Sequence, residues 1–510
     1  MPRGITRRGV LAGTATAAAT IALGGRTVQA APSTDRYLVD LRSDDVSLDG
    51  LELTHRLDEI GVAVVRGSEE AVAGLRYSRD VALSVSPPEI ERGCDDDDDH
   101  DGASEPLYYL QWDKGAQAVP GVHPEVAGRG TNVAVIDSGV YDDHPDLAHA
   151  IDSDLSRNFT GDGGDYRPNG AGDHGTHVAG IVAANAGNDR GVLGTAPETD
   201  IVACRVFSAG GGATFGDIIA AMVYAAAVGC DVANMSLGAY PVPLSDPETR
   251  LLIDVIERAA SFANEEGTLI VASAGNAGEN LDDDGDVISL PNEAANVMSI
   301  SATGPIGFRW SEEDDGGDDE DGDDSESETR DGDAERGDDD DDADRPEMKD
   351  ALEATREPPR TPAFYTNYGT DAVDVSAPGG NADRDAMGTD ANWQYDLVLS
   401  TAFTVEDDDV TPGYGWKAGT SMASPQVAAV AALVRGIAPQ ASATEVRHLI
   451  EQTARDVSPA DYRGEGHLDT TAAVEAAEEL RRGDDEEDSD DEHSDDDYGN
   501  DEHGEHGDGH

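Results

Sequence analysis

Three residue types that together can carry out acyl transfer occur where predicted elements begin or end. Asp137 closes the apolar run in "TNVAVIDSGV", His174 opens the helical pattern in "GDHGTHVAGIVAA", and Ser421 precedes the apolar helix in "AGTSMASPQVAAVAALV". Each alone has a simpler explanation, since an aspartate after a strand or a serine at a helix start is usually a cap. Together they supply a nucleophile, a general base and a carboxylate that orients the base.

Two further features bear on this chemistry. His174 and His177 are three residues apart, as metal ligands can be, but no third zinc ligand is evident nearby. Asn276 follows the strand pattern "GTLIVAS" in a Gly-Asn-Ala-Gly turn. Its side-chain amide and the backbone N–H of Ser421 are predicted to hold an oxyanion, helped by the field of a helix N-terminus.

The elements that must position these residues are short apolar strands and amphipathic helices. Continuous apolar runs indicate strands buried on both faces, as in a parallel sheet. Functional residues at strand ends and helix starts are typical of α/β sheets. We therefore predict a doubly wound α/β fold, with a mostly parallel sheet and helices on both faces.

A smaller α/β unit is predicted over residues 35–91. "RYLVDL", "GVAVV" and "DVALSV" read as strands, and "EEAVAGLRY" has helical spacing. The polar stretch 92–106 follows without periodicity, which indicates an exposed acidic linker open to cleavage.

Five motifs make residues 107–480 resemble the subtilisin-like serine proteases. "VIDSGV", "HGTHVAG", "NMSLG", "ASAGN" and "GTSMASP" occur in that family's order. The resemblance implies that His174 is catalytic and that His177 is a structural neighbour. It also implies that residues 35–91 are an inhibitory propeptide, which assists folding and is then removed by the enzyme itself.

The same resemblance implies a substrate-binding cleft. An edge strand would pair with extended substrate by β-augmentation, an aromatic residue would wall an outer apolar subsite, and two short segments would flank the primary pocket. No charged residue occupies these positions, so apolar side chains are expected before the scissile bond. The positions are Gly211 and Gly212 on the edge strand, Phe215 at the outer subsite, and Ser236, Leu237, Gly238, Ala274 and Gly275 around the pocket.

A structural calcium ion is also expected from the resemblance. Asp146 in "DDHPDL" and Asn188 in "AANAGNDRGVLG" match calcium ligands of the family. Hard cations need several oxygen ligands, and the others are not assigned. An ordinary turn aspartate and loop asparagine remain the alternative. No organic cofactor is expected.

The charge of the chain is strongly negative. Its 34 basic and 107 acidic residues give a formal charge of −73, of which −33 remains outside the three acidic runs. This excludes attraction to nucleic acid or anionic membranes through positive charge. With Lys114, Lys349 and Lys417 as the only lysines, the chain resembles proteins of extremely halophilic archaea, and we expect salt-dependent stability. Within the subtilisin-like proteases, the chain therefore resembles the halolysins, which are the haloarchaeal members of that family.

The N-terminus indicates export. Arg7 and Arg8 precede a weakly apolar run, and small residues offer a cleavage site after Ala30 or Ala31. This looks like a twin-arginine signal peptide over residues 1–31. The run is shorter and less apolar than a typical membrane span, although an uncleaved anchor is an alternative. A secreted protein without stable membrane association is expected.

The three cysteines indicate no catalytic role. Cys204 and Cys230 fall in apolar segments, where buried free thiols or a mutual disulfide are both possible, and Cys94 lies in the linker.

Two acidic segments are predicted to be disordered. One is an insertion at 311–358 within the catalytic domain, between Asn276 and Ser421; its alternative is a flap that attracts cations or steers substrate. The other is the histidine-containing tail at 481–510, which could bind transition metals weakly.

The predicted function is a secreted, salt-adapted endopeptidase that is self-processed from a zymogen and is monomeric. Its partners would be protein or peptide substrates and its own propeptide. A serine-carboxyl peptidase is one alternative, but that class has glutamate where His174 stands. A catalytically silent, acidic, cation-binding surface protein on the same scaffold is the other.

Overall fold

The computed structural model describes residues 31–43, 46–84, 90–93, 106–311, 346–387, 389–406, 409–457 and 459–492. The predicted signal peptide up to residue 30, most of the linker with Cys94, insertion residues 312–345 and the end of the tail lie outside these ranges.

The core of the chain is an eight-stranded sheet in the order β18-β15-β14-β12-β10-β6-β8-β7. Every pairing in it is parallel. From β6 the chain continues to one side through β7 and β8 and to the other from β10 onward, which places a topological switch point between β6 and β10, where ligands of α/β folds bind. The strands are β6 (Asn132–Asp137), β7 (Arg157–Asn158), β8 (Asp200–Arg205), β10 (Val232–Met235), β12 (Leu269–Ser273), β14 (Val297–Thr303), β15 (Val375–Pro378) and β18 (Gly466–His467).

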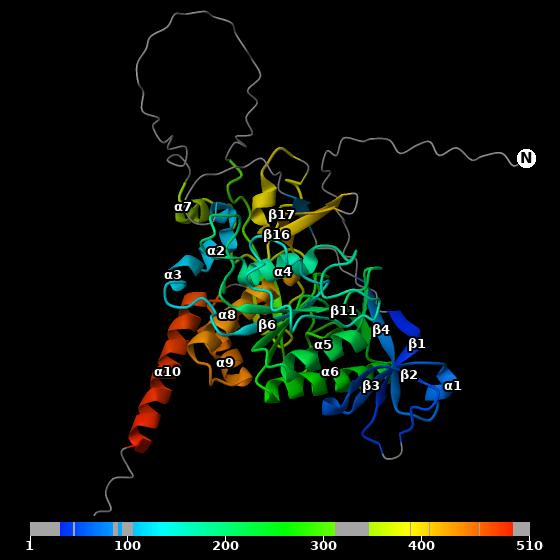
Figure 1. Cartoon of the computed structure of the whole chain (residues 1–510). Coiled ribbons are helices and arrows are strands. Elements are labelled where there is room, and N and C mark those ends of the chain that lie inside the picture. Colours follow the sequence, from blue (N-terminus) through cyan, green and yellow to red (C-terminus); the bar gives the residue numbers. More distant parts are fainter. Residues whose placement is uncertain are drawn as a thin grey trace, which may run out of the picture.

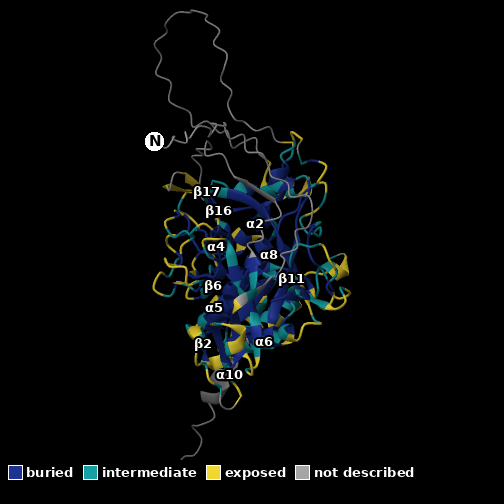
Figure 2. Ribbon diagram, turned by 90° about the vertical axis from the view of Figure 1, so that its right-hand side faces the viewer, coloured by how far each residue is buried: buried dark blue, intermediate teal, exposed yellow. Residues whose placement is uncertain are grey.

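Helices cover both faces of this sheet, as predicted (Figure 1). Val133 and Val135 of β6 belong to the apolar cluster that includes α4 and α8, whereas Ala134 and Ile136 belong to the cluster that includes α5 and α6. Burial on both sides explains why the strand reads as an unbroken apolar run, and Figure 2 shows β6 and α8 in the buried interior. The four helices are α4 (His174–Ala183), α5 (Phe215–Ala227), α6 (Pro247–Glu265) and α8 (Thr420–Ile437).

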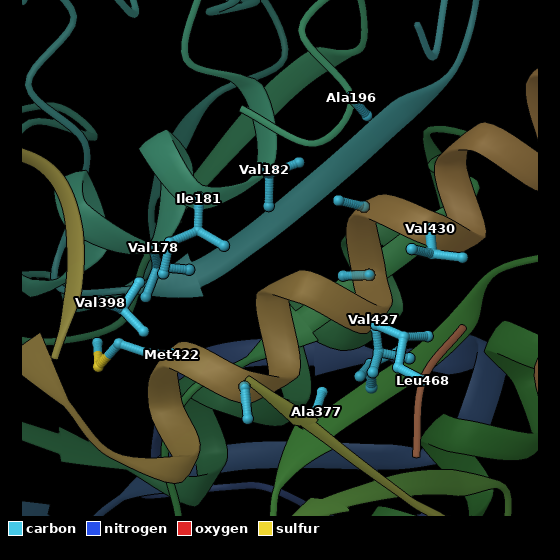
Figure 3. Packing of buried hydrophobic residues seen from close by; sticks show 14 of the residues in the cluster. Val178, Ile181, Val182, Ala196, Ala377, Val398, Met422, Val427, Val430 and Leu468 are labelled. Atoms are coloured by element: carbon cyan, nitrogen blue, oxygen red, sulfur yellow. The ribbon is translucent and has the colours of Figure 1, made fainter. Parts of the chain in front are cut away.

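Helix α8 is almost entirely enclosed. Met422 and Val427 of α8 share one buried apolar layer with Ile181 and Val182 of α4 (Figure 3). Because α4 and α8 begin at His174 and Thr420, this packing fixes the starting points of two helices that carry predicted catalytic residues.

The remaining elements of the large domain lie around this core. An antiparallel hairpin, β16–β17, leads directly into α8, and β11 pairs antiparallel with β13. These elements are β11 (Ala239–Pro243), β13 (Val287–Leu290), β16 (Val398–Glu406), β17 (Asp409–Ala418), α2 (Trp112–Ala116), α3 (Val119–Val122), α7 (Met348–Glu353), α9 (Ala443–Thr453) and α10 (Thr470–Glu492).

The N-terminal unit is an antiparallel sheet that packs beside α5 and α6 (Figure 1). Its strands follow the order β2-β3-β1-β4, and β9 of the large domain adds a fifth strand at the β4 edge. A further strand, β5, pairs antiparallel with β17. The elements are β1 (Ala31–Asp40), β2 (Glu52–Leu57), β3 (Val62–Arg66), α1 (Glu69–Val72), β4 (Tyr77–Ser84), β5 (Ile90–Gly93) and β9 (Gly212–Thr214).

The predicted disorder is wrong at the ends of both acidic segments. Residues 346–357 carry helix α7 and a backbone bridge between Ile306 and Glu357. Met348, Ala351 and Leu352 form an apolar stripe that packs on the large domain, which the acidic composition concealed. Helix α10 continues to Glu492, into the segment predicted as a tail.

Two smaller points concern cysteines and membranes. Cys204 and Cys230 are buried free thiols, and burial raises the pKa of both. Among the described residues, no helix combines the length and apolar character needed to cross a bilayer.

Candidate active site

Asp137 and His174 lie in direct contact at the carboxyl end of β6. Nδ1 of His174 lies 2.9 Å from Oδ1 and 3.0 Å from Oδ2 of Asp137. Both side chains are buried, and the backbone N–H of Ser138 also donates to the carboxylate. A carboxylate only accepts hydrogen bonds, so Nδ1 carries the proton and Nε2 is left to act as a base.

The environment of His174 sets its basicity. Burial lowers the pKa of the imidazole, but the charge and hydrogen bond of Asp137 outweigh this effect and leave the pKa above the ordinary histidine value. Lys417 lowers the pKa and Asp173 raises it, both through charge. The site therefore stabilises the imidazolium, which a general base must become during acyl transfer.

The glycine after His174 permits this contact. A Cβ added to Gly175 would lie 2.4 Å from the carbonyl oxygen of Gly139 and 3.1 Å from Oδ1 of Asp137. The N–H of Gly175 also donates to Oγ of Ser138, at 2.9 Å. A larger residue would separate the first turn of α4 from the end of β6.

Ser421 is the second residue of α8 and is joined to the end of β10. Its hydroxyl donates to the carbonyl oxygen of Ser236 at 3.2 Å, and the Ser236 hydroxyl donates to the carbonyl oxygen of Ser421 at 2.8 Å. Within the described residues, no hydrogen bond joins the Ser421 hydroxyl to His174. Catalytic hydrogen bonds often tighten only when substrate binds.

The amide of Asn276 is oriented by the first turn of α8. Its Oδ1 accepts hydrogen bonds from the backbone N–H and the hydroxyl of Thr420, at 2.9 and 2.8 Å, so Nδ2 is the donor side. An ideal Cβ on Gly419 would lie 3.3 Å from this Nδ2 and 3.6 Å from the backbone nitrogen of Ser421. Two donors thus border one small space at a helix N-terminus, as an oxyanion site requires.

Asn367 holds the turn that carries Asn276, and the sequence analysis missed it. Its Nδ2 donates to the carbonyl oxygen of Ala274 at 2.8 Å, and its Oδ1 accepts from the N–H groups of Ala277 and Glu279, at 3.0 and 3.2 Å. Asn367 lies almost a hundred residues beyond this turn, in "YTNYG". Nothing local in the sequence indicates the contact.

The predicted substrate edge is occupied by the chain's own N-terminal unit. Ser84 of β4 pairs with Gly212 of β9 in antiparallel register. The N–H of Gly211 instead donates to the carbonyl oxygen of Ser208, so it is used within a turn. Phe215 is fully buried and belongs to the same apolar cluster as Leu83.

The segments predicted to flank the primary pocket lie against α8 or the Asn276 turn. Ser236 contacts Ser421 as described, while Leu237 is buried and Gly238 approaches the carbonyl oxygen of Leu290. Ala274 accepts from Asn367, and the N–H of Gly275 donates to Oγ1 of Thr420 at 3.1 Å.

The two residues predicted to bind calcium contact each other. Nδ2 of Asn188 donates to Oδ1 of the fully buried Asp146 at 2.8 Å, and the N–H of Val192 donates to Oδ2. Oδ1 of Asn188 accepts from the N–H of Arg190, and burial raises the pKa of Asp146. A cation needs oxygen ligands, but Asn188 now presents its Nδ2 to the Asp146 carboxylate. The two residues fit a cation only if the Asn188 amide is turned so that Oδ1 takes the place of Nδ2.

His177 has a structural contact, consistent with the role implied for it. Its Nε2 lies 3.0 Å from the carbonyl oxygen of Gly415 in β17, to which it donates. Burial lowers the pKa of His177 well below its ordinary value. The described part of the chain contains no group of three His, Cys, Asp or Glu side chains suited to a metal ion.

A parallel, doubly wound α/β sheet with an aspartate–histidine contact at a strand end and a serine at a helix start is an arrangement typical of serine peptidases. The family model described as the subtilase family matches residues 128–500. The chain belongs to the subtilase family, and its large domain is that of a serine endopeptidase.

Named relatives agree with this family. The thermophilic serine proteinase of Bacillus sp. strain AK1 is 32% identical over 64% of this chain and 57% of its own length. M-protease of Shouchella clausii is 27% identical over 83% of this chain and 82% of its own length. The halolysin-like extracellular serine protease Nep of Natrialba magadii is 29% identical over 67% of this chain and 47% of its own length. The matched part is thus less than two thirds of the Bacillus and Natrialba proteins.

Solved structures share the fold. A lanthipeptide protease is 25% identical with a TM-score of 0.55, over 72% of this chain and 96% of that chain. The epidermin leader peptide processing serine protease of Staphylococcus aureus is 20% identical with a TM-score of 0.62, over 87% of this chain and 99% of that one.

Proposed function

We propose that the chain is the precursor of a secreted, salt-adapted endopeptidase that cleaves protein substrates through Asp137, His174 and Ser421. The observation that carries this proposal is the buried contact between Nδ1 of His174 and the Asp137 carboxylate. It leaves Nε2 as the base for a serine at the start of a helix.

The reaction follows from these groups. Nε2 of His174 takes the proton of the Ser421 hydroxyl as Oγ attacks the substrate carbonyl carbon, and Asp137 stabilises the resulting imidazolium. Nδ2 of Asn276 and the N–H of Ser421 hold the oxyanion. The imidazolium returns the proton to the leaving amine, which leaves an acyl-enzyme on Oγ. Water then attacks the acyl carbon while Nε2 of His174 takes its proton. The imidazolium returns that proton to Oγ of Ser421, and the carboxylic acid product leaves.

We also propose that residues 35–91 inhibit the enzyme until it cuts itself. In support, β4 pairs with the predicted substrate edge at β9, and β5 pairs with β17, which leads to Ser421. Both pairings occupy strand edges that an extended substrate would need. Cleavage within the linker at 92–105 would release the N-terminal unit.

Labelling and N-terminal sequencing test this proposal. We expect a fluorophosphonate to label Ser421 in high salt and the secreted protein to begin within or just after the linker. The Ser421→Ala variant should be unlabelled and unprocessed. An unlabelled wild type would instead favour the catalytically silent, cation-binding protein, and an acidic activity optimum would favour the serine-carboxyl mechanism.

Calcium binding at Asp146 and Asn188 is part of the proposal. A cation would hold the buried carboxylate ionised and turn the Asn188 amide. We expect a calcium chelator to lower the melting temperature of the wild type but not that of Asp146→Asn. The control is Asp143→Asn, an exposed neighbour, which should keep the chelator response. A wild-type melting temperature that does not change on chelation contradicts calcium binding.

Export and salt adaptation are supported by the sequence alone. Arg7 and Arg8 precede the weakly apolar run, and the charge of −73 is unusual in its size. Replacing both arginines with lysines should block twin-arginine export while leaving the intracellular protein intact, as followed by cell fractionation.

A further inference from the structure

A partly buried ion pair lies beside the proposed triad. Nζ of Lys417 lies 3.0 Å from Oδ1 of Asp173, and the two side chains are 1% and 16% exposed. Lys417 is one of only three lysines among 34 basic residues. The described mechanism does not use this pair.

The pair connects the two segments that carry His174 and Ser421. Asp173 is the residue before His174 and stands at the N-cap of α4, where its side chain makes no capping bond. Lys417 lies in β17, four residues before Ser421, and only Ala418 and Gly419 separate it from α8. The ion pair therefore joins the start of one catalytic helix to the strand that delivers the other.

Other side chains fasten the same hairpin to α4. Ser400 and Thr401 of β16 donate to the carbonyl oxygens of His177 and Thr176, both at 2.8 Å. These two hydrogen bonds hold the backbone of α4. The contact between Lys417 and Asp173 differs from them because it places two opposite charges next to His174.

The charges near His174 come from three elements. Asp137 of β6 and Asp173 at the start of α4 raise the pKa of the imidazole, and Lys417 of β17 lowers it. His177, the other titratable group on α4, is kept neutral by burial. Because Lys417 and Asp173 act in opposite directions, removing one has the reverse effect of removing the other.

We propose that Lys417 and Asp173 are a positioning pair that aligns the Ser421 segment with α4 and sets the basicity of His174. The proposal rests on the assignment of His174 and Ser421 as base and nucleophile. Neither Lys417 nor Asp173 touches the reacting atoms; each acts through His174.

The test is the pH dependence of kcat/KM for a small chromogenic peptide in high salt, measured on secreted enzyme from the full-length chain. Lys417→Met should move the acidic limb to higher pH and Asp173→Asn to lower pH, each by at least about half a pH unit. The double variant should return the limb close to that of the wild type. Lys417→Arg, which keeps the charge, should change the limb little while lowering kcat because its geometry differs.

Lys349→Met removes a lysine whose side chain is 82% exposed on α7, and its profile should equal that of the wild type. Limbs that stay in place, or that move in the same direction in both single variants, overturn the proposal. If one single variant is not secreted, the direction in which the limb of the other single variant moves decides, and an unchanged kcat for Lys417→Arg contradicts the alignment role. Failure of the triad itself would appear separately, as an unlabelled wild-type Ser421.

Discussion

At the scale of single residues, the proposed site depends on side chains that are held by their neighbours. Thr420 fixes the Asn276 amide with two hydrogen bonds, and Asn367 fixes the turn beneath it. Such support means that the proposed oxyanion donors are already oriented before substrate binds, and preorganised donors of this kind are what stabilises an oxyanion.

This orientation leads to a prediction for Asn276→Ala. The variant keeps the nucleophile and the base but loses one oxyanion donor. We expect kcat to fall about 10²–10³-fold, with KM nearly unchanged, because the donor acts mainly in the transition state. Steady-state kinetics on a small peptide checks this. A variant that loses affinity but keeps kcat would show that Asn276 binds the ground state instead.

At the scale of elements, the hairpin β16–β17 and helix α4 approach each other closely. A Cβ added to Gly180 in α4 would lie 2.2 Å from Oγ1 of Thr401 and 2.4 Å from Oγ of Ser400. Both hydroxyls donate to the backbone of α4. The fit of these two elements thus depends on a helix residue without a side chain.

We therefore predict that Gly180→Ala destabilises the protein. Alanine is the better helix former, but overpacking against the hairpin should cost about 1–3 kcal/mol. Gly121→Ala is a matched control, because a Cβ there meets no atom within 4 Å, and it should be neutral or slightly stabilising. Denaturant unfolding in high salt measures both. Equal stabilities for the two variants would contradict the close approach.

At the scale of the whole molecule, the two distinctive features are the large negative charge and the acidic insertion. Residues 312–345 contain 21 acidic and three basic residues, and the described chain resumes at Pro346 before α7. The strands on either side, β14 and β15, pair directly with each other. The insertion therefore interrupts neither the sheet nor the contacts that hold Asn276 and Ser421.

Replacing residues 312–345 with a flexible Gly-Ser linker tests the role of this charge. We expect unchanged kinetics on small and protein substrates and a higher melting temperature in low salt, because self-repulsion is reduced. The difference should shrink near 1 M salt, where the screening length is only about 3 Å. Slower cleavage of protein substrates alone would favour a substrate-steering flap.

Much of the fold and of the candidate active site could be predicted from the sequence. Apolar runs ending in Asp137 and helical patterns beginning at His174 and Ser421 are local signals, and local backbone preference with burial on both faces determines such elements. The apolar stripe of α7 was equally local, but the surrounding acidic composition concealed it.

The amino-acid sequence by itself determined the strands, the helices and the types of side chain at their ends. Only the tertiary structure decided which distant segments contact each other. The approach of Asn367 to the Asn276 turn, of Thr401 to Gly180, and of Lys417 to Asp173 arises only when segments far apart in sequence pack against each other. No periodicity encodes these contacts, because each depends on the three-dimensional packing of two elements and not on either one.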